Sequence, residues 1–258
     1  MAHRPSVSPS TAIVECIFCR GVVSCSHEIQ EVKTMLKRTK LRDRSLPDYS
    51  VGEEITNTAT HVIGGLLGIV ALILCVRKAA LCGGAAEITG AAIYGSCLVI
   101  LYSASSIYHG LRPSTAKKVM QILDHCAIYF LIAGSYSIVC LGALRRADPG
   151  LGYGILTLEW ALCFIAATLT AIDLKRYKLF SMICYIGMGW AVIIFWRQIL
   201  EVMTLPGFAL LLSGGIAYTI GSILYGIGKR KKWMHSVFHI FVVLGATLQF
   251  LSVLLYAV

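Results

Sequence analysis

From residue 55 onward, long apolar stretches alternate with short polar interruptions. Each stretch is close to the ~20 residues that an α-helix needs to cross a bilayer. The pattern predicts seven spans, at residues 55–76, 84–108, 125–144, 151–172, 179–199, 206–227 and 233–258. The interruptions carry charges or turn signals and are too short to fold as separate domains. We therefore expect an all-α integral membrane protein, a bundle of seven transmembrane helices.

Composition agrees with a membrane protein. Of the 258 residues, 57% are hydrophobic and only 14% are charged, whereas ordinary globular domains have about 25% charged residues. The residues before the first span differ from the rest. We interpret residues 1–34 as a disordered extension or as sequence upstream of the true start, which Met35 would mark. Residues 35–54 form a basic lead-in, and residues 55–258 form the membrane domain.

Four residues of the N-terminal extension allow an alternative interpretation. Cys16, Cys19, Cys25 and His27 could form a zinc knuckle. Their spacing, however, lacks the long loop that usually separates two pairs of zinc ligands. The extension is therefore the favoured interpretation.

The net charge of +10 is concentrated in short clusters between the apolar runs. This distribution indicates topology signals and anionic lipid headgroups as partners, and not nucleic acid. On one side of the membrane lie the cations Arg112, Lys117, Lys118, Lys175, Arg176, Lys178 and those of residues 229–232, and on the other side lie Arg77, Lys78, Arg145, Arg146 and Arg197. Because cytoplasmic loops are enriched in Lys and Arg, we expect a cytoplasmic N-terminus, an outside C-terminus and a multi-pass protein of the plasma membrane.

Histidines gather at one predicted face of the membrane. His235 and His239 are four residues apart, so on a helix they share one face and can bind a single metal ion. His109 ends the second span, and Asp124 begins the third with His125. The expected topology brings all of them to the cytoplasmic side. Buried structural histidines are the alternative, but an ionisable group in lipid is costly and generally functional.

Three neutral imidazoles that leave a fourth position open are typical of catalytic zinc. Zinc lowers the pKa of a bound water to about 7 and polarises carbonyl groups. Asp124 would then hydrogen-bond the water or orient a ligand. Ser105, one turn before His109, could donate to a ligand, to a substrate carbonyl or to Asp124. Alternatively, its hydroxyl bonds its own helix, as serines in membrane helices often do.

Other polar residues fall near the same face. We interpret Glu53, Glu54 and Asp173 as anchors of helix ends in the headgroup region. His61 is open to either a structural or a functional interpretation. Glu159 lies within the fourth span and has no assigned role.

Several motifs occur together in a specific order. They are Glu53-Glu54-x6-His61-x2-Gly64, Ser105-x3-His109, Asp124 and His235-x3-His239. Over residues 40–258 the chain resembles the bacterial haemolysin III family, which is related to the progestin and adiponectin receptors and, more distantly, to alkaline ceramidases. The resemblance implies a seven-helix bundle with zinc bound by His109, His235 and His239, and with Asp124 and Ser105 as the acidic and hydroxyl partners.

The resemblance leaves three functions open. The first is zinc-dependent hydrolysis of an amide-linked lipid, such as an N-acyl lipid of the membrane. The second is a haemolytic pore, in which zinc is structural. The third is a ligand sensor, which we rank last because the chain offers no folded soluble domain to transmit a signal. The sequence does not determine the oligomeric state.

Overall fold

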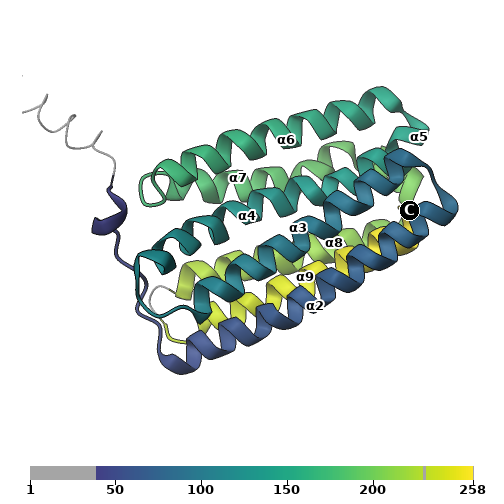
Figure 1. The fold of residues 1–258 in the computed structure, drawn as a ribbon. Coiled ribbons are helices and arrows are strands. Elements are labelled where there is room, and N and C mark those ends of the chain that lie inside the picture. The colour runs from purple at the N-terminus through teal and green to yellow at the C-terminus, as the bar shows by residue number, and fades with distance from the viewer. Residues whose placement is uncertain (1–38, 229–230, 258) are drawn as a thin grey trace, which may run out of the picture. The chain divides into compact units, whose positions relative to one another are not determined.

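A computed structural model describes residues 39–228 and 231–257 of the chain. The regular elements in these ranges are all helical, without a β-strand. In order they are η1 Leu41–Asp43, α2 Val51–Cys82, α3 Ala85–Gly110, α4 Thr115–Val139, the π-helical turn η2 Cys140–Leu144, α5 Arg145–Ala147, α6 Pro149–Ile172, α7 Lys178–Trp190, η3 Ala191–Phe195, α8 Trp196–Gly228 and α9 Met234–Tyr256 (Figure 1). The N-terminal cysteines with His27, and the cations Lys229 and Arg230, lie outside the described residues.

Side-chain caps determine where several helices begin. Ser50 and Glu53 form a reciprocal capping box at the start of α2, and Asp148 caps α6 just before Pro149. Ser114 accepts a hydrogen bond from the amide of Lys117, so α4 begins at Thr115. The sequence pattern predicts the third span from residue 125, ten residues after the observed start of α4, because residues 115–124 are too polar to belong to an apolar run. They continue the same helix.

Among the described residues, six stretches are long and apolar enough to cross a membrane, judged by length and composition. One of them, Lys178–Gly228, has 51 residues and contains two of the seven predicted spans. Within it, Thr204 has φ 61° and ψ 168°, which interrupts the helical backbone of α8 two residues before Pro206. The fold is therefore an all-α membrane fold, with a break between the predicted fifth and sixth spans.

The helices of Leu41–Val258 pack with their neighbours along the chain, α2 with α3, α3 with α4, and α8 with α9 (Figure 1). α9 also packs on α2, which brings the last helix back to the first. Small residues allow close approach. A Cβ on Gly95 of α3 would lie 2.5 Å from the Cα of Leu72 in α2. At the end of the bundle away from the start of α2, the buried carboxylate of Glu87 pairs with Arg145 and Arg146, at 2.9 and 3.0 Å.

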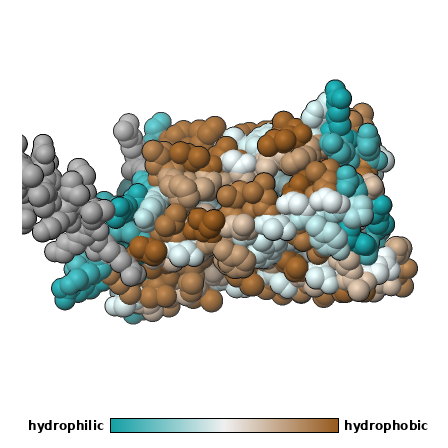
Figure 2. All heavy atoms as spheres, turned by 90° about the horizontal axis from the view of Figure 1, so that it is seen from above, coloured by the Kyte–Doolittle hydropathy of each residue, from teal (hydrophilic) through white to brown (hydrophobic). Residues whose placement is uncertain are grey.

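The sides of the bundle are apolar. In Figure 2, hydrophobic residues cover most of the face shown, and hydrophilic residues gather toward its two ends. Large side chains such as Ile63, Leu66 and Ile73 of α2 are about 60% exposed, which in water would be unfavourable over so wide a surface. This surface suits the hydrocarbon of a bilayer.

Candidate metal centre

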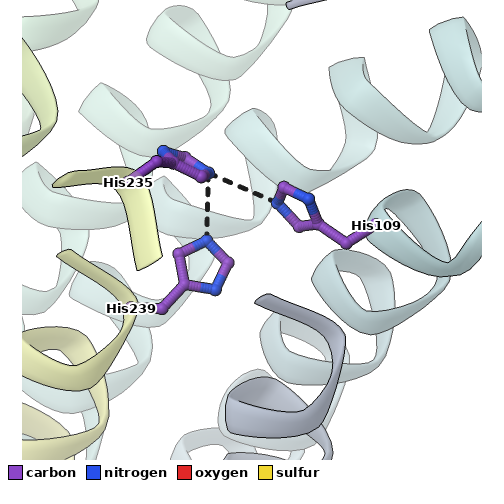
Figure 3. A group of neighbouring side chains, drawn as sticks. All are labelled: His109, His235 and His239. Atoms are coloured by element: carbon purple, nitrogen blue, oxygen red, sulfur yellow. Dashed lines mark hydrogen bonds between the residues drawn. The ribbon is translucent and has the colours of Figure 1, made fainter. Parts of the chain in front are cut away.

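Three histidines from two helices far apart in the sequence meet inside the bundle. His109 lies in the last turn of α3, and His235 and His239 lie in the first two turns of α9. All three are buried, and their nitrogens lie within 4.8 Å of one another. Figure 3 shows the rings directed toward a common point, with His235 Nε2 at 3.3 Å from His109 Nε2 and 3.1 Å from His239 Nε2. The expected triad is therefore assembled by tertiary structure.

The two nitrogen–nitrogen distances at His235 match those of a tetrahedral metal shell. Zinc binds histidine nitrogen at about 2.0–2.1 Å, so two nitrogens of a tetrahedral shell lie roughly 3.3 Å apart. Neutral imidazoles cannot satisfy both contacts at His235 Nε2, because this nitrogen carries either a proton or a lone pair and the Nε2 of His109 has only a lone pair. A positive ion between the rings would satisfy them. A single cation would engage all three lone pairs. The donor set is thus one that could hold a metal ion.

Glu54 determines the orientation of His109. Its Oε2 lies 2.6 Å from His109 Nδ1, so the ring donates its Nδ1 proton to the carboxylate and presents the Nε2 lone pair to the other histidines. The second oxygen of Glu54 accepts from Lys117 Nζ at 2.6 Å. Metal-binding histidines usually have such a carboxylate behind them. Our interpretation of Glu54 as a simple helix-end anchor is therefore wrong.

A second contact holds α9 beside α2. The buried side chain of Asn57 accepts a hydrogen bond from the hydroxyl of Ser236, at 2.7 Å, next to His235. Nearby, Glu53 Oε1 accepts from the backbone amide of Trp233 at 2.6 Å. Trp233 has φ 67°, a left-handed conformation that is unusual for tryptophan and immediately precedes α9. Sequence analysis missed Asn57 and Ser236, because neither is chemically distinctive without its partner.

Tyr49 covers the site from the segment before α2. Its ring stacks on His235, with centroids 4.8 Å apart and an interplanar angle of 17°, and lies 5.7 Å from the ring of His109. Burial raises the pKa of the Tyr49 hydroxyl, and the neighbouring Tyr225, Glu54 and Asp124 add to the increase. The hydroxyl therefore stays protonated at neutral pH and is available as a donor.

The family comparison agrees with this geometry. The family described as "Haemolysin-III related" matches residues 49–250, a range that contains every residue of the histidine cluster. The chain belongs to the haemolysin III family. Within it, the chain is 37% identical to the "Hemolysin-3 homolog" of Bacillus subtilis over 81% of its own length and 97% of that protein, and 36% identical to "Hemolysin-3" of Bacillus cereus over 80% and 92%.

A more distant relative comes from a plant. "Heptahelical transmembrane protein 4" of Arabidopsis thaliana is 24% identical to the chain over 63% of the chain and 46% of the plant protein. Together with the six membrane-compatible stretches, membership of the haemolysin III family makes the chain a multi-pass membrane protein, as expected from the sequence.

The two predicted catalytic residues of this haemolysin III chain lie in different environments. Ser105 is buried one turn from His109, and its hydroxyl has no hydrogen-bond partner among the described residues. Asp124 is partly exposed on α4, with Oδ2 3.6 Å from Nδ1 of His125. No hydrogen bond from Asp124 to the three histidines occurs in the part of the chain that the structure describes. It is close enough to Tyr49 to act on it electrostatically, and the roles of both residues stay predictions.

His61 also contacts the cluster. Its ring stacks on His239, with centroids 3.8 Å apart, and meets the ring of Tyr102 edge-on at 5.1 Å. Both ring nitrogens are buried without a hydrogen-bond partner in the described chain. By contrast, Asp173 accepts from the backbone amides of Lys175 and Arg176 after α6, as a helix-end residue does.

Proposed function

We propose that this haemolysin III protein binds zinc through His109, His235 and His239 and hydrolyses an amide bond in a membrane lipid. The observation that carries the proposal is the convergence of three buried imidazoles whose nitrogens lie within 4.8 Å of one another, with His235 Nε2 3.1 Å from His239 Nε2 and 3.3 Å from His109 Nε2. Three neutral imidazoles with a fourth position open are the ligand set of catalytic zinc, whereas structural sites usually have four protein ligands.

The chain's own residues have distinct roles in this reaction. Zinc, when bound, supplies a Lewis acid that activates water and polarises a carbonyl. Glu54 holds His109 in the ligating tautomer through the 2.6 Å contact with Nδ1. Ser105 donates a hydrogen bond to the substrate carbonyl. Asp124 accepts the proton of the attacking water and returns it to the departing amine nitrogen, so that the C–N bond breaks after the new C–O bond has formed. Tyr49 shields the ring of His235 and keeps bulk water from one side of the site.

The substrate class follows from where the cluster lies. The three histidines are buried inside a bundle whose sides are apolar, and these surroundings favour a lipid over a soluble polar substrate. The resemblance to alkaline ceramidases favours an amide-linked lipid. Membrane lipids are therefore the proposed partners, and nucleic acid is not.

We further propose that the chain crosses the membrane seven times, with its N-terminus in the cytoplasm. A straight helix of the 51 residues Lys178–Gly228 would extend roughly 76 Å, far more than the ~30 Å hydrocarbon core. The break at Thr204 divides this stretch into two crossings. The name of the plant relative, "Heptahelical transmembrane protein 4", supports the same count.

The metal content of the detergent-purified protein tests the proposal. We expect about one zinc per chain by mass spectrometry, and none in a variant that combines His109→Ala, His235→Ala and His239→Ala. His125→Ala is the matched control, because His125 lies on α4 and bonds the carbonyl of Gln121 outside the cluster. This variant should keep its zinc. A zinc-loaded protein would then be assayed against ceramides and other N-acyl lipids, with the triple variant as the blank.

A wild-type protein that carries no stoichiometric metal after chelator-free purification would contradict zinc binding. Zinc without turnover of any N-acyl lipid would contradict only the hydrolase. The second candidate, a pore with structural zinc, is favoured by the name "Hemolysin-3" of the Bacillus cereus relative. Liposome conductance that persists in the triple variant would support it.

A further inference from the structure

One face of α3 carries a buried row of polar side chains that begins at the metal centre and runs into the bundle. Tyr94, Tyr102, Ser105 and His109 are spaced so that they follow one side of the helix, and all four are buried. The hydroxyls of Tyr94 and Ser105 have no hydrogen-bond partner in the described chain. The helical rise places Tyr94 roughly 22 Å from His109, which is most of the ~30 Å thickness of the hydrocarbon core.

α2 places a further polar group beside this row. Asn57 lies opposite His109, with Nδ2 3.4 Å from Nδ1, and Gly64 lies against the ring of Tyr102. His61 is one turn beyond Asn57 and therefore reaches the level of Ser105. Its two buried nitrogens are unpaired within the described residues, although its ring is fixed by stacking.

α8 contributes a tyrosine to the same region. Tyr218 packs against the core cluster that contains Tyr94 and Tyr102, and its buried hydroxyl also lacks a partner among the residues described. The hydroxyl of Tyr102 donates to the carbonyl of Val242, but over a long 3.4 Å. The row and the side chains beside it thus carry five polar atoms without a partner in the described part of the chain, on His61, Ser105, Tyr94 and Tyr218.

Buried polar atoms in proteins are almost always hydrogen-bonded, to protein or to ordered water. Inside a bilayer the requirement is stricter, because lipid cannot supply a partner. A second group of buried polar side chains in the bundle is satisfied by hydrogen bonds within the protein. On the α4–α6 side, Tyr129 bonds Thr170 at 3.0 Å and Thr170 bonds Ser181 at 2.9 Å, so protein side chains satisfy one another there. In the α3 row, the hydroxyls of Tyr94 and Ser105 have no such partner in the described chain, so they need another one.

We propose that a file of internal water molecules occupies this row and forms a hydrated track from the metal centre to the level of Tyr94. Water is the ligand that these groups share, since imidazole nitrogens and hydroxyls can each donate to it or accept from it. The track gives the histidine site a water supply from inside the bundle, on the side that Tyr49 does not cover. The inference concerns water and does not require bound zinc.

X-ray radiolysis of the wild-type protein in lipid nanodiscs tests the track. Radiolysis converts ordered water to hydroxyl radicals that modify adjacent side chains, even when these are shielded from bulk solvent, and mass spectrometry locates the modified residues. We expect Tyr94 and Tyr218 to be modified at least severalfold faster than Tyr129. Tyr94 and Tyr129 are both fully buried, so burial alone predicts equal protection. Equal protection of all three tyrosines would overturn the proposal.

Removal of single hydroxyls gives a second measurement. Tyr94→Phe should lower the melting temperature if water bonds the hydroxyl, as Tyr129→Phe should by removing its bond to Thr170. A dry, unpaired hydroxyl would give the opposite sign for Tyr94→Phe, because its removal would relieve a desolvation cost. A higher melting temperature for Tyr94→Phe would therefore overturn the proposal, whatever the metal content of the protein.

Discussion

At the residue scale, one carboxylate organises the candidate metal centre. Glu54 lies on α2, its partner His109 on α3 and its second partner Lys117 on α4, so a single side chain joins three helices behind the cluster. The lysine keeps the carboxylate ionised, and the carboxylate in turn accepts the Nδ1 proton of His109. Hydrogen bonds to ionised groups are stronger than neutral ones. The tautomer of His109 therefore depends on the charge of Glu54.

Glu54→Gln should weaken zinc binding by about 10- to 100-fold, the usual cost of losing the carboxylate behind a metal-binding histidine. The amide keeps the size of the side chain but lacks its charge. Zinc affinity measured by competition with a chelating dye would test this. Glu201→Gln is the control, because Glu201 is exposed on α8 and should bind zinc as the wild type does. An unchanged affinity for Glu54→Gln would show that His109 is oriented by other groups.

At the scale of elements, the bundle depends on close contact between the first two long helices. His109 comes from α3 and its partners Glu54 and Asn57 from α2, so the separation of these helices determines the hydrogen bonds. Gly95 permits the contact, because a Cβ there would meet the backbone and side chain of Leu72 at 2.5–2.6 Å. Backbone atoms cannot move aside without separating the helices.

Gly95→Ala should therefore lower the free energy of unfolding by about 1–3 kcal/mol, the usual cost of overpacking. Gly154→Ala in α6 is matched to it, because nothing lies within 4 Å of a Cβ at that position. There the alanine should leave stability unchanged or raise it slightly, since alanine favours helix over glycine. Thermal unfolding of both variants in the same detergent would make the comparison. Equal melting temperatures would mean that α2 and α3 can separate without cost.

At the scale of the whole molecule, the number of crossings determines on which side of the membrane the C-terminus lies relative to the histidine cluster. The starts of α2 and α9 and the end of α3 lie together at the site. The loop cations favour the cytoplasm for that end. An odd number of crossings then places the C-terminus outside, whereas six crossings would return it to the cytoplasm.

A reporter at the C-terminus distinguishes these topologies. Alkaline phosphatase folds only outside the cytoplasm, so a fusion after Val258 should be active in a seven-crossing protein. A truncation fused after Arg112, in the loop between α3 and α4, should be inactive and serves as the control. An inactive C-terminal fusion, produced at the same level, would contradict the seven-crossing topology.

The sequence alone determined the class of protein and the candidate ligands. Apolar runs of membrane length predict helices because burial in lipid depends on composition within one segment, and His235 and His239 share a face because helical spacing is local. The family resemblance, carried by motifs in order, was confirmed. The sequence also predicted a break in the region of residues 199–206, where the structure has its irregular Thr204.

Tertiary structure decided the contacts between distant segments. Glu54 and His109 are 55 residues apart, and Trp233 lies 180 residues from Glu53, so no local pattern could pair them. The same holds for the stacking of Tyr49 on His235 and of His61 on His239, since a side chain's partner depends on which helix packs beside it. The sequence pattern also placed the start of α4 too late along the chain. The first turns of this helix are polar, and they are buried only because neighbouring helices pack against them. Hydropathy and spacing are properties of one segment, whereas hydrogen-bond partners and helix contacts are properties of the folded bundle.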